Sequence, residues 1–191
     1  MTGFLRAVAA AAVLAAAMPL ALAQAPTPAP ESVPAPEGVP DGSTGPVGRT
    51  SGLQVPRFVS LKADKVNVRS GPTRDHGVAW VFTRAGLPVE ITAEFETWRR
   101  IRDADGAEGW VYHSMLSGRR TALVNPWKAG EEIPLYASPS KDSAVRARLE
   151  AGVLGKIEHC DGKWCRFFEN GFDGFIEQER LWGVYPGEKL E

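Results

Sequence analysis

The sequence predicts an all-β protein built from two tandem small antiparallel β-barrels. Three observations predict this fold class. Short runs of alternating apolar and polar residues recur after residue 57, Asp-Gly and Asn-Gly pairs separate several of them, and the pattern occurs twice. Alternation with period two between frequent turns is typical of strands in a small barrel, and no amphipathic run is long enough for a major helix.

Composition excludes several classes of protein. The 191 residues carry 22 basic and 23 acidic side chains, for a net charge of −1. This balance excludes binding to nucleic acid by bulk charge. Two cysteines and three histidines are too few for a cysteine-rich zinc site. The chain has no Gly-rich phosphate loop and no H-E-x-x-H motif, so we expect neither a metal nor a cofactor.

Residues 1–23 have the pattern of a cleaved secretory signal. Arg6 precedes an Ala-rich apolar run, and small residues at positions 21 and 23 fit a signal peptidase site. The apolar run is shorter than the ~20 residues that a membrane-spanning helix needs. We therefore expect cleavage between Ala23 and Gln24, no stable membrane insertion afterwards, and a periplasmic or secreted location.

Residues 24–57 are predicted to be a disordered Pro-rich linker. Between residues 24 and 56 the chain has eight prolines, five glycines and no aromatic residue. Such a stretch buries too little apolar surface to offset the loss of chain entropy on folding. The prolines show no P-x-x-P spacing, which favours a spacer over a ligand for an SH3 or WW domain.

The rest of the chain contains an internal repeat with a shift of 65 to 67 residues, which indicates two copies of one domain at 58–120 and 121–191. The matching pairs are Pro72 and Pro139, Gly86 and Gly152, Trp98 and Trp164, Trp110 and Phe175, and Leu116 and Leu181. Each copy is near the lower size limit for an independent core. We therefore expect the copies to pack on each other, with the unrepeated Trp127 and Trp182 as candidates to fill the junction.

Alternation places the strands within each copy. In the first copy, strands are expected near residues 66–69, 89–95, 98–102 and 110–112, with Val89, Ile91, Ala93 and Phe95 on one face of the second. In the second copy they are expected near 153–160, 164–168 and 172–176. Two-residue hairpin turns are predicted at Asp161-Gly162 and Asn170-Gly171, because both central positions of such a turn favour positive φ.

These motifs resemble a bacterial SH3-type domain. The resemblance is carried by the run from Val66 to Pro72, by Gly86 before an alternating strand, by Trp98, and by Gly109-Trp110-Val111. The second copy keeps the frame but lacks the opening motif. Together with the signal and spacer, the chain resembles exported bacterial proteins with two tandem SH3 domains. The resemblance implies small barrels with a binding role in the cell envelope, often toward peptidoglycan or peptides, and no catalytic residues.

Cys160 and Cys165 flank a predicted turn, and we expect them to form a disulfide. Cysteines opposite each other on a hairpin are within bonding distance, and an exported protein meets an oxidising environment. A two-residue turn at Asp161-Gly162 would instead pair Cys160 with Lys163, so the bridge needs a longer loop. The first copy has Glu94 and Arg99 at these two positions.

Basic and aromatic residues of the first copy are the candidate ligand-binding site. Residues 57–121 carry 11 basic and 8 acidic side chains, whereas residues 122–191 carry 9 and 12. The arginines suit carboxylates. The alternative, which charge patterning favours, is a polar barrel face or docking against the acidic second copy. The candidate residues are Arg69, Trp80, Arg99, Arg100, Arg102 and Tyr112, with the neighbourhood of Arg69 and Tyr112 as the preferred contact face.

The functional hypothesis is a non-enzymatic binding protein of the bacterial cell envelope, with peptidoglycan or a peptide segment as its partner. One rival hypothesis is a structural or regulatory partner of another envelope protein. The other is a thiol-dependent enzyme that uses Cys160 or Cys165, with thiol titration as its test. The sequence names neither the ligand nor the barrel that binds it, nor an oligomeric state.

Overall fold

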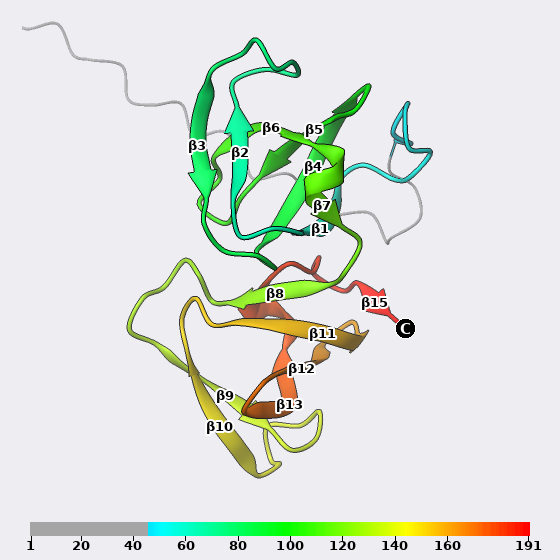
Figure 1. Ribbon diagram of the computed structural model, residues 1–191. Helices are drawn as coiled ribbons and strands as arrows, with labels where there is room; N and C mark the ends of the chain where they lie inside the picture. Colours follow the sequence, from blue (N-terminus) through cyan, green and yellow to red (C-terminus); the bar gives the residue numbers. More distant parts are fainter. Residues whose placement is uncertain (1–45) are drawn as a thin grey trace, which may run out of the picture. The chain divides into compact units, whose positions relative to one another are not determined.

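The computed structural model describes residues 46–191, and the regular secondary structure of these residues is almost entirely antiparallel strands (Figure 1). The expected signal peptide and residues 24–45 of the expected linker lie outside the described residues. In the described part, the helical segments are the short 3-10 turns η1 (His113–Met115) and η2 (Gln178–Arg180), and no helix has the length and hydropathy needed to cross a bilayer. The all-β prediction is confirmed.

The first sheet has seven strands in the order β3-β2-β6-β5-β4-β1-β7. These strands are β1 (Arg57–Leu61), β2 (Val66–Arg69), β3 (Val78–Phe82), β4 (Pro88–Phe95), β5 (Trp98–Arg102), β6 (Glu108–Tyr112) and β7 (Leu116–Ser117). The sheet curls around one core of buried aliphatic residues, namely Val59, Leu61, Val66, Val68, Val89, Ile91, Ile101 and Val111.

The second sheet repeats this order as β10-β9-β13-β12-β11-β8-β14, with β15 paired to β11. Its strands are β8 (Thr121–Val124), β9 (Glu132–Tyr136), β10 (Val145–Glu150), β11 (Leu154–Asp161), β12 (Trp164–Glu169), β13 (Phe172–Glu177), β14 (Leu181–Trp182) and β15 (Lys189–Leu190). Its separate core contains Ile133, Leu135, Phe167, Ile176 and the two cysteines among other residues. The prediction of two tandem copies of one small barrel is thus confirmed.

A β-bulge at the same place in both barrels changes which residues face the core. β4 shifts register against β5 between Ile91 and Ala93, and β11 has the equivalent shift against β12. One extra residue reverses the inward and outward alternation beyond it. The expectation that Ala93 and Phe95 share the face of Ile91 is therefore wrong. Phe95 is 48% exposed, whereas the side chain of Glu94 is only 1% exposed.

The hairpin between β11 and β12 turns one residue later than predicted. Its central residues are Gly162 and Lys163, because β11 ends at Asp161 and β12 begins at Trp164. The Asp161 carboxylate accepts hydrogen bonds from the backbone N–H groups of Lys163 at 2.8 Å and Trp164 at 2.7 Å. The aspartate thus holds the turn from its first position. The turn predicted at residues 170–171 joins β12 to β13 as expected.

Residues 46–56 are folded, which corrects the expectation of a disordered linker up to residue 57. Val47 and Gln54 form an antiparallel bridge. The backbone N–H of Gly48 donates to the carbonyl of Leu53 at 2.7 Å, and that of Val55 donates to the carbonyl of Pro46 at 2.9 Å. We call residues 46–56 the N-terminal clip.

The buried carboxylate of Glu94 attaches this clip to the first barrel. It accepts hydrogen bonds from the backbone N–H of Ser51 at 2.9 Å and from its hydroxyl at 2.6 Å. The guanidinium groups of Arg57 and Arg99 lie 2.8 Å and 3.3 Å from Glu94 Oε1. A compositional rule for linkers misses this anchor because the partner lies about forty residues away along the chain.

The two barrels are joined by a packed junction, as their small size predicted. Phe58 on β1 packs against Trp182 at 5.0 Å and against Tyr185 at 4.7 Å between ring centroids. The indole N–H of Trp182 donates to the carbonyl of Pro88 at 3.3 Å. Trp182 therefore fills the junction as expected, whereas Trp127 does not, because it is 56% exposed.

Candidate functional site

An aromatic pair marks one face of the first barrel. Trp98 begins β5 and Tyr112 ends β6, and these residues are register partners. Their rings pack edge to face, with centroids 5.5 Å apart. The ring of His113 lies 5.0 Å from Tyr112 on the other side. The packing holds Tyr112 in place while leaving it partly exposed, which suits a binding platform.

The loop between β2 and β3, residues 70–77, lies beside this pair. Arg69 at the end of β2 donates from one guanidinium nitrogen to the carbonyls of Arg74 at 3.1 Å and His76 at 2.6 Å. Thr73 adds a hydrogen bond to the His76 ring at 2.8 Å. The sequence-predicted residue Arg69 thus shapes the loop from within.

The fixed loop places Arg74 against Tyr112. The guanidinium carbon of Arg74 lies 6.0 Å from the centroid of the Tyr112 ring, which is within cation–π range. Arg74 is exposed, and within residues 46–191 it forms no ion pair. The sequence analysis missed Arg74, although the repeat shift aligns it with another cation, Lys141.

Three of the predicted arginines are paired with carboxylates of the same barrel. Arg99 is buried beside Glu94, Arg100 pairs with Glu108, and Arg102 donates to Glu90 with its Nε at 2.8 Å. The cross-strand pairing of β4, β5 and β6 brings these charges together. Within the described residues this arrangement matches the polar barrel face that the sequence left open as the alternative.

Trp80 lies in the barrel wall. Its ring packs edge to face with Phe82 at 6.2 Å and covers Gly109, where a Cβ atom would lie 3.0 Å from the indole. The indole N–H is buried and has no hydrogen-bond partner among the described residues. The structure therefore places Trp80 mainly in a packing role, whereas Arg69 is linked to Tyr112 through the loop that carries Arg74.

The equivalent face of the second barrel has a different set of side chains. Trp164 again packs edge to face with a tyrosine at 5.5 Å, but the tyrosine is Tyr136 on β9. Tyr136 pairs with Phe175 as Arg69 pairs with Trp110. Both barrels thus have a tryptophan at this position, but its tyrosine partner comes from β6 in the first barrel and from β9 in the second.

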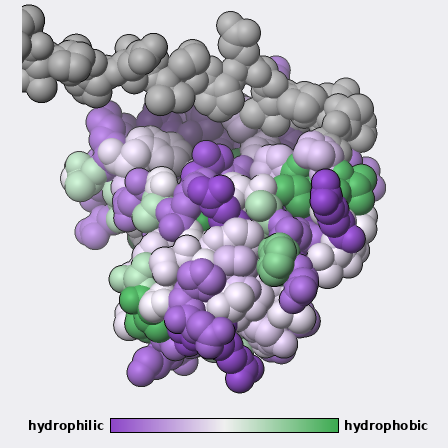
Figure 2. Space-filling model, turned by 90° about the horizontal axis from the view of Figure 1, so that it is seen from above, coloured by the Kyte–Doolittle hydropathy of each residue, from purple (hydrophilic) through white to green (hydrophobic). Residues whose placement is uncertain are grey.

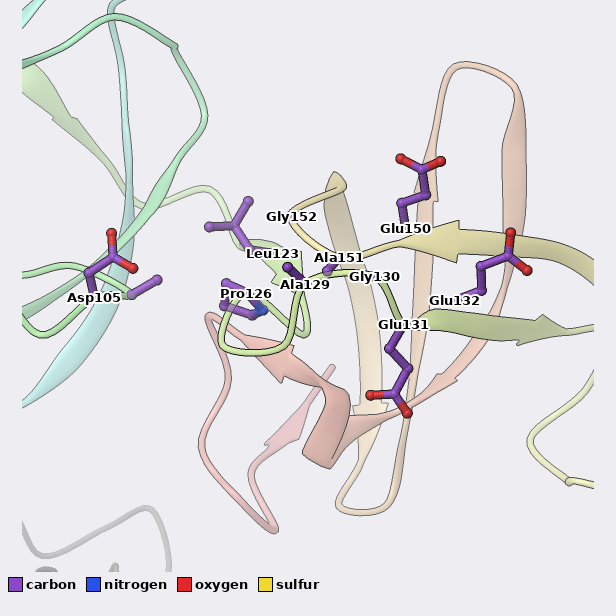
Figure 3. Close-up of a pocket in the computed structure, with 11 residues that line it drawn as sticks. Asp105, Leu123, Pro126, Ala129, Gly130, Glu131, Glu132, Glu150, Ala151 and Gly152 are labelled. Carbon is purple, nitrogen blue, oxygen red and sulfur yellow. The ribbon is translucent and has the colours of Figure 1, made fainter.

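A pocket of about 510 Å³ lies elsewhere, where the loop at residues 126–132 approaches Asp105 (Figure 3). Figure 3 shows the carboxylates of Glu131, Glu132 and Glu150 pointing away from one another. Within residues 46–191 no group of three or more acidic, His or Cys side chains is arranged to hold a metal ion. The pocket therefore lacks convergent polar groups of the kind that orient a ligand.

Apolar side chains do not offer a large docking patch on the face seen in Figure 2. They form small separate areas between hydrophilic residues. Large exposed apolar patches mark protein or membrane contacts. The surface on this face is therefore mainly polar.

Both cysteines are bonded to each other in the second barrel. Cys160 and Cys165 are register partners with their Cα atoms 4.1 Å apart, and they form a disulfide. The turn at Gly162-Lys163 pairs Cys160 with Cys165, whereas a turn at Asp161-Gly162 would have paired Cys160 with Lys163. Both residues are buried, and the neighbouring His159 ring hydrogen-bonds the carbonyl of Leu190 at 3.1 Å.

Comparison with known proteins agrees with the duplicated architecture. The family described as "Bacterial SH3 domain" matches residues 62–118 and again residues 129–183. No curated protein matches the chain.

Two solved structures from Trichomonas vaginalis show weak similarity. NlpC2 is 18% identical with a TM-score of 0.31, over 68% of this chain and 49% of that chain. NlpC1 has the same identity and TM-score over 71% of this chain and 48% of that chain. The chain thus spans about half the length of these proteins.

Proposed function

Because the chain belongs to the bacterial SH3 domain family, we propose that it is a non-enzymatic binding protein of the bacterial cell envelope. Its partner is peptidoglycan or a peptide segment. The contact face is the aromatic and basic surface of the first barrel formed by Arg74, Tyr112 and His113, with the buried Trp98 supporting Tyr112 from below. This assignment keeps the expected neighbourhood of Arg69 and Tyr112 and adds Arg74 to it.

One observation carries the proposal. Tyr112 is held between Trp98 and His113 and lies under an exposed cation, Arg74. The loop that carries Arg74 is already fixed by Arg69. A ligand that binds here does not have to order the backbone of this loop, which lowers the entropic cost of binding.

Export to the periplasm or the medium is part of the proposal. It rests on the signal pattern of residues 1–23. The Cys160–Cys165 disulfide supports it, because such bonds persist in oxidising compartments. Fractionation of a bacterium that expresses the gene, with mass spectrometry of the N-terminus, tests both the location and cleavage after Ala23.

Sedimentation with purified, protein-free cell walls tests the binding function. We expect the protein to co-sediment with the walls. Tyr112→Ala is expected to weaken binding about tenfold or more, since an anchoring aromatic residue contributes about 2 kcal/mol or more. Tyr136→Ala is the matched control, because Tyr136 has the same edge-to-face contact in the second barrel. Walls that leave the protein in the supernatant at all concentrations contradict the proposal.

A second sedimentation arm, with walls that retain their envelope proteins, separates the first rival hypothesis. Binding that requires envelope proteins on the walls indicates a structural or regulatory partner instead. The thiol-enzyme hypothesis requires a free thiolate, whereas both sulfur atoms are bonded to each other in the barrel core. Thiol titration of the unreduced protein checks this point.

A further inference from the structure

The two barrels place a cation against the same strand end but give it different partners. Arg74 and Lys141 occupy equivalent loops, and Tyr112 and Glu177 end the equivalent strands β6 and β13. Figure 1 shows each loop, β2–β3 and β9–β10, at an end of its own barrel. In the first barrel the contact is cation to aromatic ring at 6.0 Å. In the second it is an ion pair, with Lys141 Nζ 2.6 Å from Glu177 Oε1.

The charge of Lys141 is therefore neutralised by a neighbouring carboxylate, whereas the charge of Arg74 is not. The Lys141 ammonium group donates to the Glu177 carboxylate, and this contact raises the pKa of the ammonium group. The second barrel thus supplies its own anion. A tyrosine ring attracts the guanidinium of Arg74 but carries no charge that cancels it. Within residues 46–191, no carboxylate forms an ion pair with Arg74.

The remaining contacts leave the Arg74 head group available. Its backbone carbonyl is fixed by Arg69 at 3.1 Å, while no hydrogen bond of its guanidinium occurs among the described residues. A guanidinium can bind a carboxylate through two parallel N–H···O bonds, which are stronger than neutral hydrogen bonds. The flat Tyr112 ring beside it offers apolar contact to the part of the ligand next to the carboxylate.

We infer that the first barrel binds its ligand through a carboxylate, with Arg74 as the anchoring residue and Tyr112 as the adjoining platform. At the equivalent site of the second barrel, Lys141 is already paired with Glu177 and is not available to a ligand carboxylate. This inference rests on the proposed function and adds the charge class of the ligand and the barrel that holds it.

Binding of soluble wall fragments tests the inference. Muropeptides with free carboxylates are titrated into the full-length protein, followed by calorimetry and amide chemical shifts. The same fragments with their carboxyl groups converted to amides form the second arm. We expect amidation to weaken binding about tenfold or more, because hydrogen bonds to charged groups are the stronger ones. Shift changes are expected around Arg74 and not around Lys141.

Matched substitutions assign the site. Arg74→Gln is expected to cause the same loss as amidation, and Lys141→Gln is expected to cause none. Tyr112→Glu copies the arrangement of the second barrel and should abolish binding even though it adds no bulk to the core. The double variant Lys141→Arg/Glu177→Tyr copies the first barrel and should raise the stoichiometry from one fragment to two. These side chains are partly or fully exposed, and the amide spectrum reports whether each variant is folded.

The outcomes distinguish failure of the inference from failure of the function. Equal binding of free and amidated fragments, or full binding by folded Arg74→Gln, overturns the carboxylate anchor while the wall-binding function stands. Shift changes centred on Lys141 overturn the choice of barrel. Absence of binding to both fragments and whole walls overturns the inference and the proposed function together.

Discussion

Glu94 and Arg99 are register partners in the first barrel at the position where Cys160 and Cys165 are bonded in the second. The equivalent bulges turn both pairs toward the core. One barrel closes this hairpin with a covalent bond and the other with a buried ion pair. The ion pair does more than replace the bond, because Glu94 also holds the N-terminal clip.

Glu94→Gln is expected to destabilise the first barrel and release the clip. The amide leaves Arg57 and Arg99 without their charged acceptor, and hydrogen bonds to charged groups contribute about 1.5–3 kcal/mol each. Denaturant unfolding measures the loss, and hydrogen exchange at Ser51 reports detachment of the clip. Glu108→Gln is the control. Its ion pair with Arg100 is partly exposed, so its removal should cost about 0–1 kcal/mol. Equal effects of the two variants contradict the anchoring role.

Attachment of the clip should depend on pH in the acidic range. Burial, the largest influence, raises the pKa of Glu94, but hydrogen bonds from Ser51 and Arg57 and the charge of Arg99 outweigh it and lower the pKa to about 2. A carboxylate with a lowered folded pKa stabilises the fold fully above its unfolded value of 4.5. That stabilisation is lost as the pH falls toward 2. Pepsin cleavage within residues 46–56 should therefore accelerate across this window, and Glu94→Gln should cleave rapidly throughout it.

Reduction of the disulfide should destabilise the second barrel and, through the packed junction, lower the midpoint of the single unfolding transition. The bond closes a loop with a sequence separation of 5, for which chain entropy predicts about 2 kcal/mol. Denaturant unfolding with and without reductant measures this change, and a Cys160→Ser/Cys165→Ser variant should match the reduced protein. Thiol titration should find no thiol before reduction and two after it. Two reactive thiols in the unreduced native protein would revive the thiol-enzyme hypothesis.

The architecture was predictable because it depends on features that repeat locally. The shift of 65 to 67 residues, period-two alternation and the turn at residues 170–171 indicated two barrels, and the core confirms them. Trp182 was predictable as a junction residue because it has no counterpart in the first copy. Trp127 met the same criterion but lies in an exposed loop, so an unrepeated aromatic residue alone does not identify an interface.

The site was less predictable because its chemistry depends on cross-strand register. A single bulge between Ile91 and Ala93 turned Glu94 inward and Phe95 outward, which simple alternation does not anticipate. The arginines of β5 looked like a free basic group in sequence. Their carboxylate partners lie on the neighbouring strands β4 and β6. The contact between Arg74 and Tyr112 joins residues 38 positions apart, and alternation within a single strand does not anticipate it.

Tyr185→Phe tests how firmly the junction couples the two barrels. The Tyr185 hydroxyl donates to the buried carboxylate of Glu90 at 2.8 Å, while its ring packs on Phe58. Phenylalanine keeps the ring contact and leaves one Glu90 oxygen without this donor, so we expect a loss of about 1–3 kcal/mol. Thermal unfolding should change from one transition toward two as the barrels uncouple, and an unchanged single transition contradicts this role.

Alkaline titration gives an independent measure of the same contact. Burial, together with the charge and hydrogen bonding of Glu90, raises the pKa of Tyr185 far above its usual 10.0. The unfolded chain ionises this phenol near that usual value but the folded chain does not, so the contact favours folding below about pH 10 and stability falls as the pH rises further. Of the three tyrosines, Tyr185 should therefore ionise only when the protein unfolds. Absorbance at alkaline pH should lose one late, cooperative step in Tyr185→Phe, and a Tyr185 that titrates in the folded protein would show that the phenol is not held by Glu90.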